Sequence, residues 1–203
     1  MKKPWDYLPQ LSEERLKIVA AMIVDARHAA LSLFDEEAGD TAWSYGCRAY
    51  DWCRYSIIKA SISGEYPWLS YYPNNGLEFA FSIGEVPVRF YKGDPDKPND
   101  RTLKQCHPEL NQLELELFDK DICPNLLWRL AIETFESGEV LSVTVIGCTR
   151  DGIPECLWKV PLSEMVPVIN ITEIQDDDGE DIPEPVVKYR VEHKRASNEN
   201  DDK

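Results

Sequence analysis

The chain has 203 residues, of which 37 are acidic and 22 are basic, and its net charge at pH 7 is −15. A surface with this excess of negative charge repels the phosphate backbone of nucleic acids and the headgroups of anionic lipids, so we expect neither nucleic acid nor a membrane as a direct partner. A basic protein is the partner class that such a surface favours. No stretch of the sequence approaches the roughly 18 consecutive apolar residues that a membrane-spanning helix requires.

Length and apolar content predict one α+β domain. Apolar residues make up 43% of the chain, which is enough to bury a core. We expect this domain to span residues 1–172, with a helical hairpin at about 12–62 and a sheet with a third helix at about 66–172. Residues 173–203 are rich in Asp and Glu, and we expect them to form an acidic, partly disordered tail.

The six cysteines are typical of free thiols in a reducing compartment, because they lie in apolar segments and form no C-x-x-C pair. Cys106 and His107 are the only adjacent cysteine and histidine, which is too few ligands for a zinc site, so we expect no metal and no cofactor. The segment from Met1 to Trp5 is not followed by the apolar run of a secretory signal, which predicts a cytoplasmic protein.

The predicted hairpin begins at Ser12, whose hydroxyl can cap a helix and is followed by two glutamates that favour the positive end of the helix dipole. Apolar residues recur every three or four positions and extend this helix to about Asp35. Gly39 and Asp40 interrupt the pattern, and a second helix follows from about Trp43 to Ser61. A short loop between two amphipathic helices predicts that they pack antiparallel.

Alternation of apolar and polar residues then predicts an antiparallel sheet of about five to six strands, with the helices on one face. The predicted strands lie at 68–72, 77–83, 86–90, 128–134, 141–145 and 156–160. Asp151-Gly152 is a strong hairpin signal between the last two strands. A short third helix is expected around Leu110, Leu113 and Leu117, before Pro124.

Catalytic motifs are missing from the sequence. It has no glycine-rich phosphate loop, no H-E-x-x-H and no G-x-S-x-G, and with three histidines a histidine-based triad has few ways to assemble. One group of charged residues is still a candidate ligand site, because its members occupy the polar phase of three predicted strands and would converge on one open face of the sheet. The residues of this charged sheet face are Arg89, Arg129, Glu133 and Lys159.

Aromatic residues are concentrated in the second helix and in the segment after it, on more than one helical face, so not all of them can point into a single core. Trp and Tyr are enriched where binding energy concentrates in protein interfaces. We therefore predict a partner-binding surface from the aromatic surplus and the acidic tail. Its residues are Trp52, Tyr55, Tyr71, Tyr72, Asp176, Asp177 and Asp178.

These observations favour a non-enzymatic cytoplasmic protein that binds a basic protein and inhibits or neutralises it, as an antitoxin or a mimic of nucleic acid would. An alternative is a small-molecule-binding or enzymatic domain that uses the charged sheet face. A third alternative is a homo-oligomeric structural or adaptor protein. An exposed aromatic patch rimmed by Asp and Glu would favour the first hypothesis, and a deep pocket beneath the charged face would favour the second.

Overall fold

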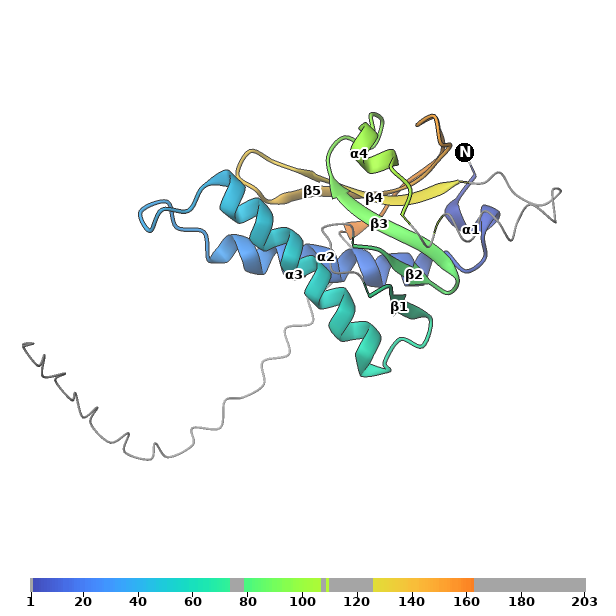
Figure 1. Ribbon diagram of the computed structural model, residues 1–203, viewed down its shortest axis with the longest axis horizontal. Coiled ribbons are helices and arrows are strands. Elements are labelled where there is room, and N and C mark those ends of the chain that lie inside the picture. The colour runs from blue at the N-terminus through green and yellow to red at the C-terminus, as the bar shows by residue number, and fades with distance from the viewer. Residues whose placement is uncertain (1, 74–78, 107–108, 110–125, 163–203) are drawn as a thin grey trace, which may run out of the picture. The chain divides into compact units, whose positions relative to one another are not determined.

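The computed structural model describes residues 2–73, 79–106, 109 and 126–162 (Figure 1). Within these ranges two long helices precede a six-stranded mixed sheet, so the predicted α+β class is confirmed. The helices are α1 (Pro4–Tyr7), α2 (Glu13–Ser32), α3 (Ala42–Ser63) and α4 (Asp100–Leu103). The strands are β1 (Leu69–Tyr71), β2 (Phe81–Ile83), β3 (Val86–Lys92), β4 (Leu127–Thr134), β5 (Val140–Cys148) and β6 (Pro154–Lys159).

Helix α2 begins where the sequence predicts it. The Ser12 side chain accepts a hydrogen bond from the backbone N–H of Arg15 at 3.4 Å, and two glutamates occupy the first turn. The helix ends at Ser32, a little before the predicted Asp35, because Asp35 is used in the next loop. Its carboxylate accepts hydrogen bonds from the backbone N–H groups of Glu37 and Ala38.

Helix α3 is bounded by two local signals. Thr41 and Ser44 form a reciprocal capping box at its start, and Gly64 ends it in the left-handed conformation with φ of 76°. The two long helices pack against each other: the Cys53 thiol approaches the carbonyl of Ile23 at 3.6 Å, and both residues are fully buried. Alanines on the buried sides of both helices permit this close approach.

The six strands that the structure describes are neighbours in sequence order, β1 to β6. All neighbouring pairs are antiparallel except β3 and β4, which run parallel. The prediction of a purely antiparallel sheet is therefore wrong at its centre. A parallel pair needs a crossover, and the long connection that contains α4 provides it.

The main core lies between the sheet and the two long helices. Every second residue of the strands points into it, including Val88, Leu130, Val143 and Trp158. The opposite face carries a smaller apolar cluster to which Leu103, the last residue of α4, contributes. Helices α2 and α4 thus lie on opposite sides of the strands (Figure 1). The strand residues that alternate with the main-core residues, including the polar ones, point toward α4.

Two predicted features lie outside the described residues: the third helix around Leu110, Leu113 and Leu117, and the acidic tail, 173–203. The described part of the second predicted strand is short, because β2 begins only at Phe81. A search of the described helices finds none that is long and apolar enough to cross a membrane.

Candidate functional site

The sheet register places the four residues of the charged sheet face on the side of α4. Arg89 of β3 lies directly beside Arg129 of β4. Glu133 lies four residues after Arg129 on the same strand, β4. Lys159 of β6 pairs with Thr144 of β5, and Thr144 pairs with Ala131 of β4. Successive side chains of a strand alternate between faces, so all four residues share one face.

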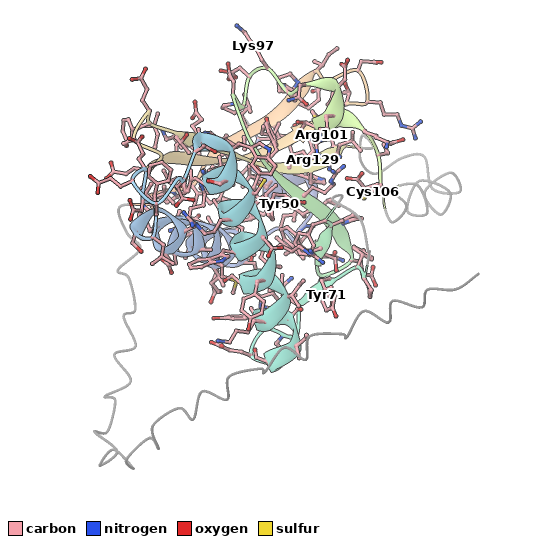
Figure 2. The ribbon with its side chains drawn as sticks, turned by 60° about the vertical axis from the view of Figure 1, so that its left-hand side comes forward. Tyr50, Tyr71, Lys97, Arg101, Cys106 and Arg129 are labelled. Atoms are coloured by element: carbon pink, nitrogen blue, oxygen red, sulfur yellow. The ribbon has the colours of Figure 1, made fainter. Side chains whose placement is uncertain are left out.

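Arg129 is buried within this face, and its guanidinium is already bonded to other residues of the chain. It is 1% exposed, and both of its terminal nitrogens contact the carboxylate of Glu109, which is 5% exposed. The Arg129 Nε also donates to the carbonyl of Thr102 at 2.9 Å. Figure 2 labels Arg129 on the sheet together with Arg101 of α4 and Cys106 of the segment after α4. The guanidinium therefore fastens the crossover segment onto the sheet.

The neighbouring charges have local roles too. The Arg89 guanidinium donates to the carbonyl of Lys104 at 2.8 Å, and Glu133 accepts a hydrogen bond from the Ser142 hydroxyl. Lys159 is exposed. This face is thus partly covered by Thr102, Lys104 and Glu109 rather than open, and Arg129 already has a carboxylate partner. A ligand role for the four residues stays a prediction.

Cys106 lies next to this ion pair and carries a buried thiol. Its backbone N–H donates to Glu109 at 2.8 Å, and its side chain is buried. Burial, reinforced by the adjacent Glu109 carboxylate, raises the pKa of the Cys106 thiol to about 11. Because the thiolate is the nucleophilic form, this environment suppresses nucleophilic chemistry at Cys106.

The aromatic residues of the predicted partner-binding surface differ in exposure. Tyr55 is 65% exposed, whereas Trp52 is half-buried against the cluster of Ala30, Tyr45 and Ala49. Tyr71 and Tyr72 are half-buried at the end of β1, and Tyr71 packs on the main core. In Figure 2, Tyr71 lies beside the C-terminal half of α3, away from Arg129. Asp176, Asp177 and Asp178 lie outside the described residues.

A second surface, which sequence reasoning missed, lies where the α2–α3 loop meets the β4–β5 turn. We call it the acidic end and define it as residues 33–45 and 135–139; both segments lie at the left of Figure 1. Three large apolar side chains are exposed here: Leu33 at 57%, Trp43 at 78% and Phe135 at 52%. Exposed side chains of this size concentrate at interaction sites.

A buried hydrogen-bond chain holds the two segments of the acidic end together. The Tyr45 phenol donates to the carbonyl of Gly138 at 3.0 Å, and it accepts from an Arg27 Nη2 at 3.5 Å. Arg27 is 4% exposed and also lies over the Tyr45 ring, 5.7 Å from its centroid. The ring of Phe34 contacts Tyr45 edge-on, with centroids 6.1 Å apart. This packing fixes the turn against the helices.

Carboxylates dominate the charge of the acidic end. Its two segments contain no Lys or Arg, and they contain Asp35, Glu36, Glu37, Asp40, Glu136 and Glu139. Arg48, from the next turn of α3, pairs with Asp40 at 2.8 Å. This hydrogen bond makes the largest contribution to lowering the pKa of the Asp40 carboxyl. Of the ion pairs among the described residues, none engages the glutamates of the acidic end.

One part of the acidic end is visible in the sequence and one is not. The run Asp35-Glu36-Glu37 between Leu33 and Trp43 is a local signal for an exposed acidic loop with apolar borders. The contribution of Phe135, Glu136 and Glu139 depends on a tertiary contact between segments that are far apart in the chain. Periodicity cannot predict such a contact.

Two features of the described residues bear on metal binding and on thiol chemistry. Among those residues no three His, Cys, Asp or Glu side chains are grouped to hold a metal ion. Burial raises the pKa of the thiols of Cys53 to about 12 and of Cys156 to about 11.

In comparisons with known proteins, no family model, no curated protein and no solved structure matches this chain.

Proposed function

We propose that this protein binds a basic protein through its acidic end and neutralises that partner by covering its basic surface. The observation that supports this proposal is the exposure of Leu33, Trp43 and Phe135 within a border of carboxylates. Buried aromatic anchors surrounded by a polar rim are the usual arrangement of energetic centres in protein interfaces. Trp43 would be the main anchor, because its side chain is large and 78% exposed.

The charge of the whole chain supports the same partner class. A net charge of −15 attracts a cationic protein over a distance of about one Debye length, roughly 8 Å at physiological salt, and repels anionic competitors. Electrostatic attraction mainly raises the association rate, whereas the apolar anchors slow dissociation. Seven sequence-derived residues remain proposals for a wider contact: Trp52, Tyr55, Tyr71, Tyr72, Asp176, Asp177 and Asp178. A cytoplasmic location remains part of the same proposal.

The test is affinity capture with variants of the acidic end. Wild-type protein is immobilised, and bound proteins from a cytoplasmic extract of the native host are identified after washes at low and high salt. We expect one basic protein in stoichiometric amount that is lost as salt rises. Trp43→Ser should reduce its recovery by at least about tenfold, since removing a hot-spot aromatic typically costs 2 kcal/mol or more. Glu36→Lys with Glu136→Lys should slow association.

Matched controls separate a specific surface from general acidity. Ile153→Ser removes an apolar side chain that is 58% exposed in the β5–β6 turn, at the other end of β5 from the acidic end. Glu65→Lys and Glu85→Lys make the same change in net charge at exposed sites elsewhere. These variants should capture the partner normally. The proposal would be contradicted if both sets of variants reduced partner recovery equally, or if Trp43→Ser did not reduce it.

The alternative function, ligand binding on the charged sheet face, predicts a different result. The captured material would then be a small anionic molecule retained by monomeric protein, and Lys159→Ala or Arg89→Ala would release it. The ion pair between Arg129 and Glu109 argues against this alternative, because the most buried cation of that face is already neutralised.

A further inference from the structure

The outer face of helix α3 is a continuous exposed ridge, separate from the acidic end over most of its length. The residues at successive i, i+4 positions are Trp43, Cys47, Asp51, Tyr55 and Lys59, and all of them are exposed. The buried residues Tyr45, Ala49, Cys53 and Ile57 occupy the opposite side of the helix. One full side of α3 therefore faces solvent.

The C-terminal half of α3 exposes two large hydrophobic side chains on the same side as this ridge. Tyr55 is 65% exposed and Ile62, about two turns further along the helix, is 68% exposed. Asp51 pairs with Arg54 at 3.5 Å, but its side chain remains 69% exposed, so its carboxylate is accessible to a second cation. These side chains would gain from burial against a matching surface.

The charges along the ridge match those of a second copy of the same ridge that runs antiparallel to it. Asp51, Tyr55 and Lys59 are spaced by four residues, so reading the ridge backwards gives a cation, the same aromatic ring and an anion. In an antiparallel pair of such helices around a two-fold axis at Tyr55, each Asp51 lies level with the Lys59 of the other copy. A two-fold contact of this kind requires one self-complementary patch and no other partner.

We propose that the occupant of this ridge is a second copy of the chain, packed antiparallel through α3. The two Tyr55 rings stack at the two-fold axis, and two symmetric ion pairs between Asp51 and Lys59 flank them. In the dimer, Tyr55 is therefore not available for the wider contact with a basic partner. Ridges of i, i+4 residues from two helices cross at about 50°, so the contact is confined to the central turns. Trp43 lies 12 residues from Tyr55, about 18 Å along the axis, and stays free for the acidic end.

Sedimentation equilibrium of the full chain at about 0.15 M salt tests the pairing, because this ionic strength screens repulsion between the two acidic molecules. Wild-type protein should form a dimer with increasing concentration. Asp51→Lys and Lys59→Asp each place like charges opposite each other twice, and each should weaken the dimer by at least about tenfold. An equimolar mixture of the two variants should form a heterodimer, because both ion pairs are then restored with opposite sign.

The orientation has its own test, since Cys47 is exposed on the same ridge. In the antiparallel arrangement the two Cys47 residues are about 24 Å apart along the axis, whereas in a parallel pair they are adjacent. Mild oxidation of the Cys123→Ser protein should therefore give no cross-linked dimer, whereas Tyr55→Cys in a Cys47→Ser, Cys123→Ser background should cross-link at the two-fold axis. Asp25→Lys, a matched charge change on α2, should dimerise like wild type.

Three results would overturn the proposal. The first is a wild-type monomer at every concentration, and the second is a mixture of the two charge variants that associates no better than either alone. The third is rapid cross-linking through Cys47, which would show a parallel pair. Circular dichroism of each variant checks that it is folded, and the exposure of Asp51 and Lys59 makes a folding defect from these substitutions small.

Discussion

The phenol of Tyr45 in α3 donates a hydrogen bond of 3.0 Å to the carbonyl of Gly138, 93 residues further along the chain. Both residues are buried, and the bond joins the first turn of α3 to the β4–β5 turn. The exposed side chains of Trp43 and Phe135 are carried by these same two segments. The geometry of the acidic end therefore depends on this internal contact.

Tyr45→Phe should lower the free energy of unfolding by about 1 kcal/mol, because the buried Gly138 carbonyl and the Arg27 guanidinium both lose their hydrogen-bond partner. We also expect weaker capture of a basic partner, since the β4–β5 turn is then held less firmly. Urea unfolding followed by fluorescence measures the first effect. Tyr55→Phe is the control, because Tyr55 is exposed, and it should leave the stability unchanged.

Gly138→Ala should destabilise the protein by about 1–3 kcal/mol. Gly138 has φ of 91°, a conformation that costs an L-residue about 1–2 kcal/mol, and a Cβ atom would lie 3.1 Å from both the Leu31 Cδ1 and the Tyr45 Cε1. Gly39→Ala is a matched control with φ of 96° and no atom within 4 Å of the added Cβ. The difference between the two variants in urea unfolding isolates the packing contribution. Equal effects would show that the turn yields to the added methyl group.

Glu109→Ala should cost about 3–5 kcal/mol of stability, because it leaves the buried Arg129 charge without its carboxylate. The double variant Glu109→Leu, Arg129→Met should recover most of this loss, since two apolar side chains of similar volume replace the pair. Urea unfolding of the two proteins measures both values. A single variant as stable as wild type would mean that Arg129 finds another anion.

Stability should decrease at alkaline pH. In the unfolded chain cysteine thiols ionise near their ordinary pKa of 9.0, whereas in the folded protein burial raises the pKa of Cys53 to about 12 and that of Cys106 and Cys156 to about 11. The folded state keeps these protons to higher pH, so the free energy of unfolding is unaffected below about pH 9 and falls above it. Urea unfolding at several pH values up to about 10.5 measures the slope, which Cys→Ala substitution at the three sites should reduce.

Thiol labelling should distinguish Cys47 from the other described cysteines. Cys47 is exposed, whereas Cys53, Cys106, Cys148 and Cys156 are buried. In a Cys123→Ser background, a chromogenic disulfide reagent should modify one thiol at the rate of a free thiol and the other four only as the protein opens. Cys47→Ser should abolish the fast phase. A second fast thiol in the same background would show that the core opens locally.

The sequence by itself determined the elements whose signals are local. Ser12 and Thr41 cap the two long helices through their own side chains, Gly64 ends the second, and period-two alternation marks β3, β4, β5 and β6. These signals act within a few residues, so they can be read without knowing what packs against them. The α+β class follows from the order of the elements.

Tertiary structure alone decided how distant segments meet. The parallel pairing of β3 with β4 depends on the path of a long crossover, and alternation is the same in parallel and antiparallel strands. The polar phase of β4 predicted an open position for Arg129, but Glu109 and the Thr102 carbonyl cover it. The acidic end likewise requires Tyr45 and Gly138 to meet, because contact between residues 93 positions apart is set by packing of the whole core and by no local pattern.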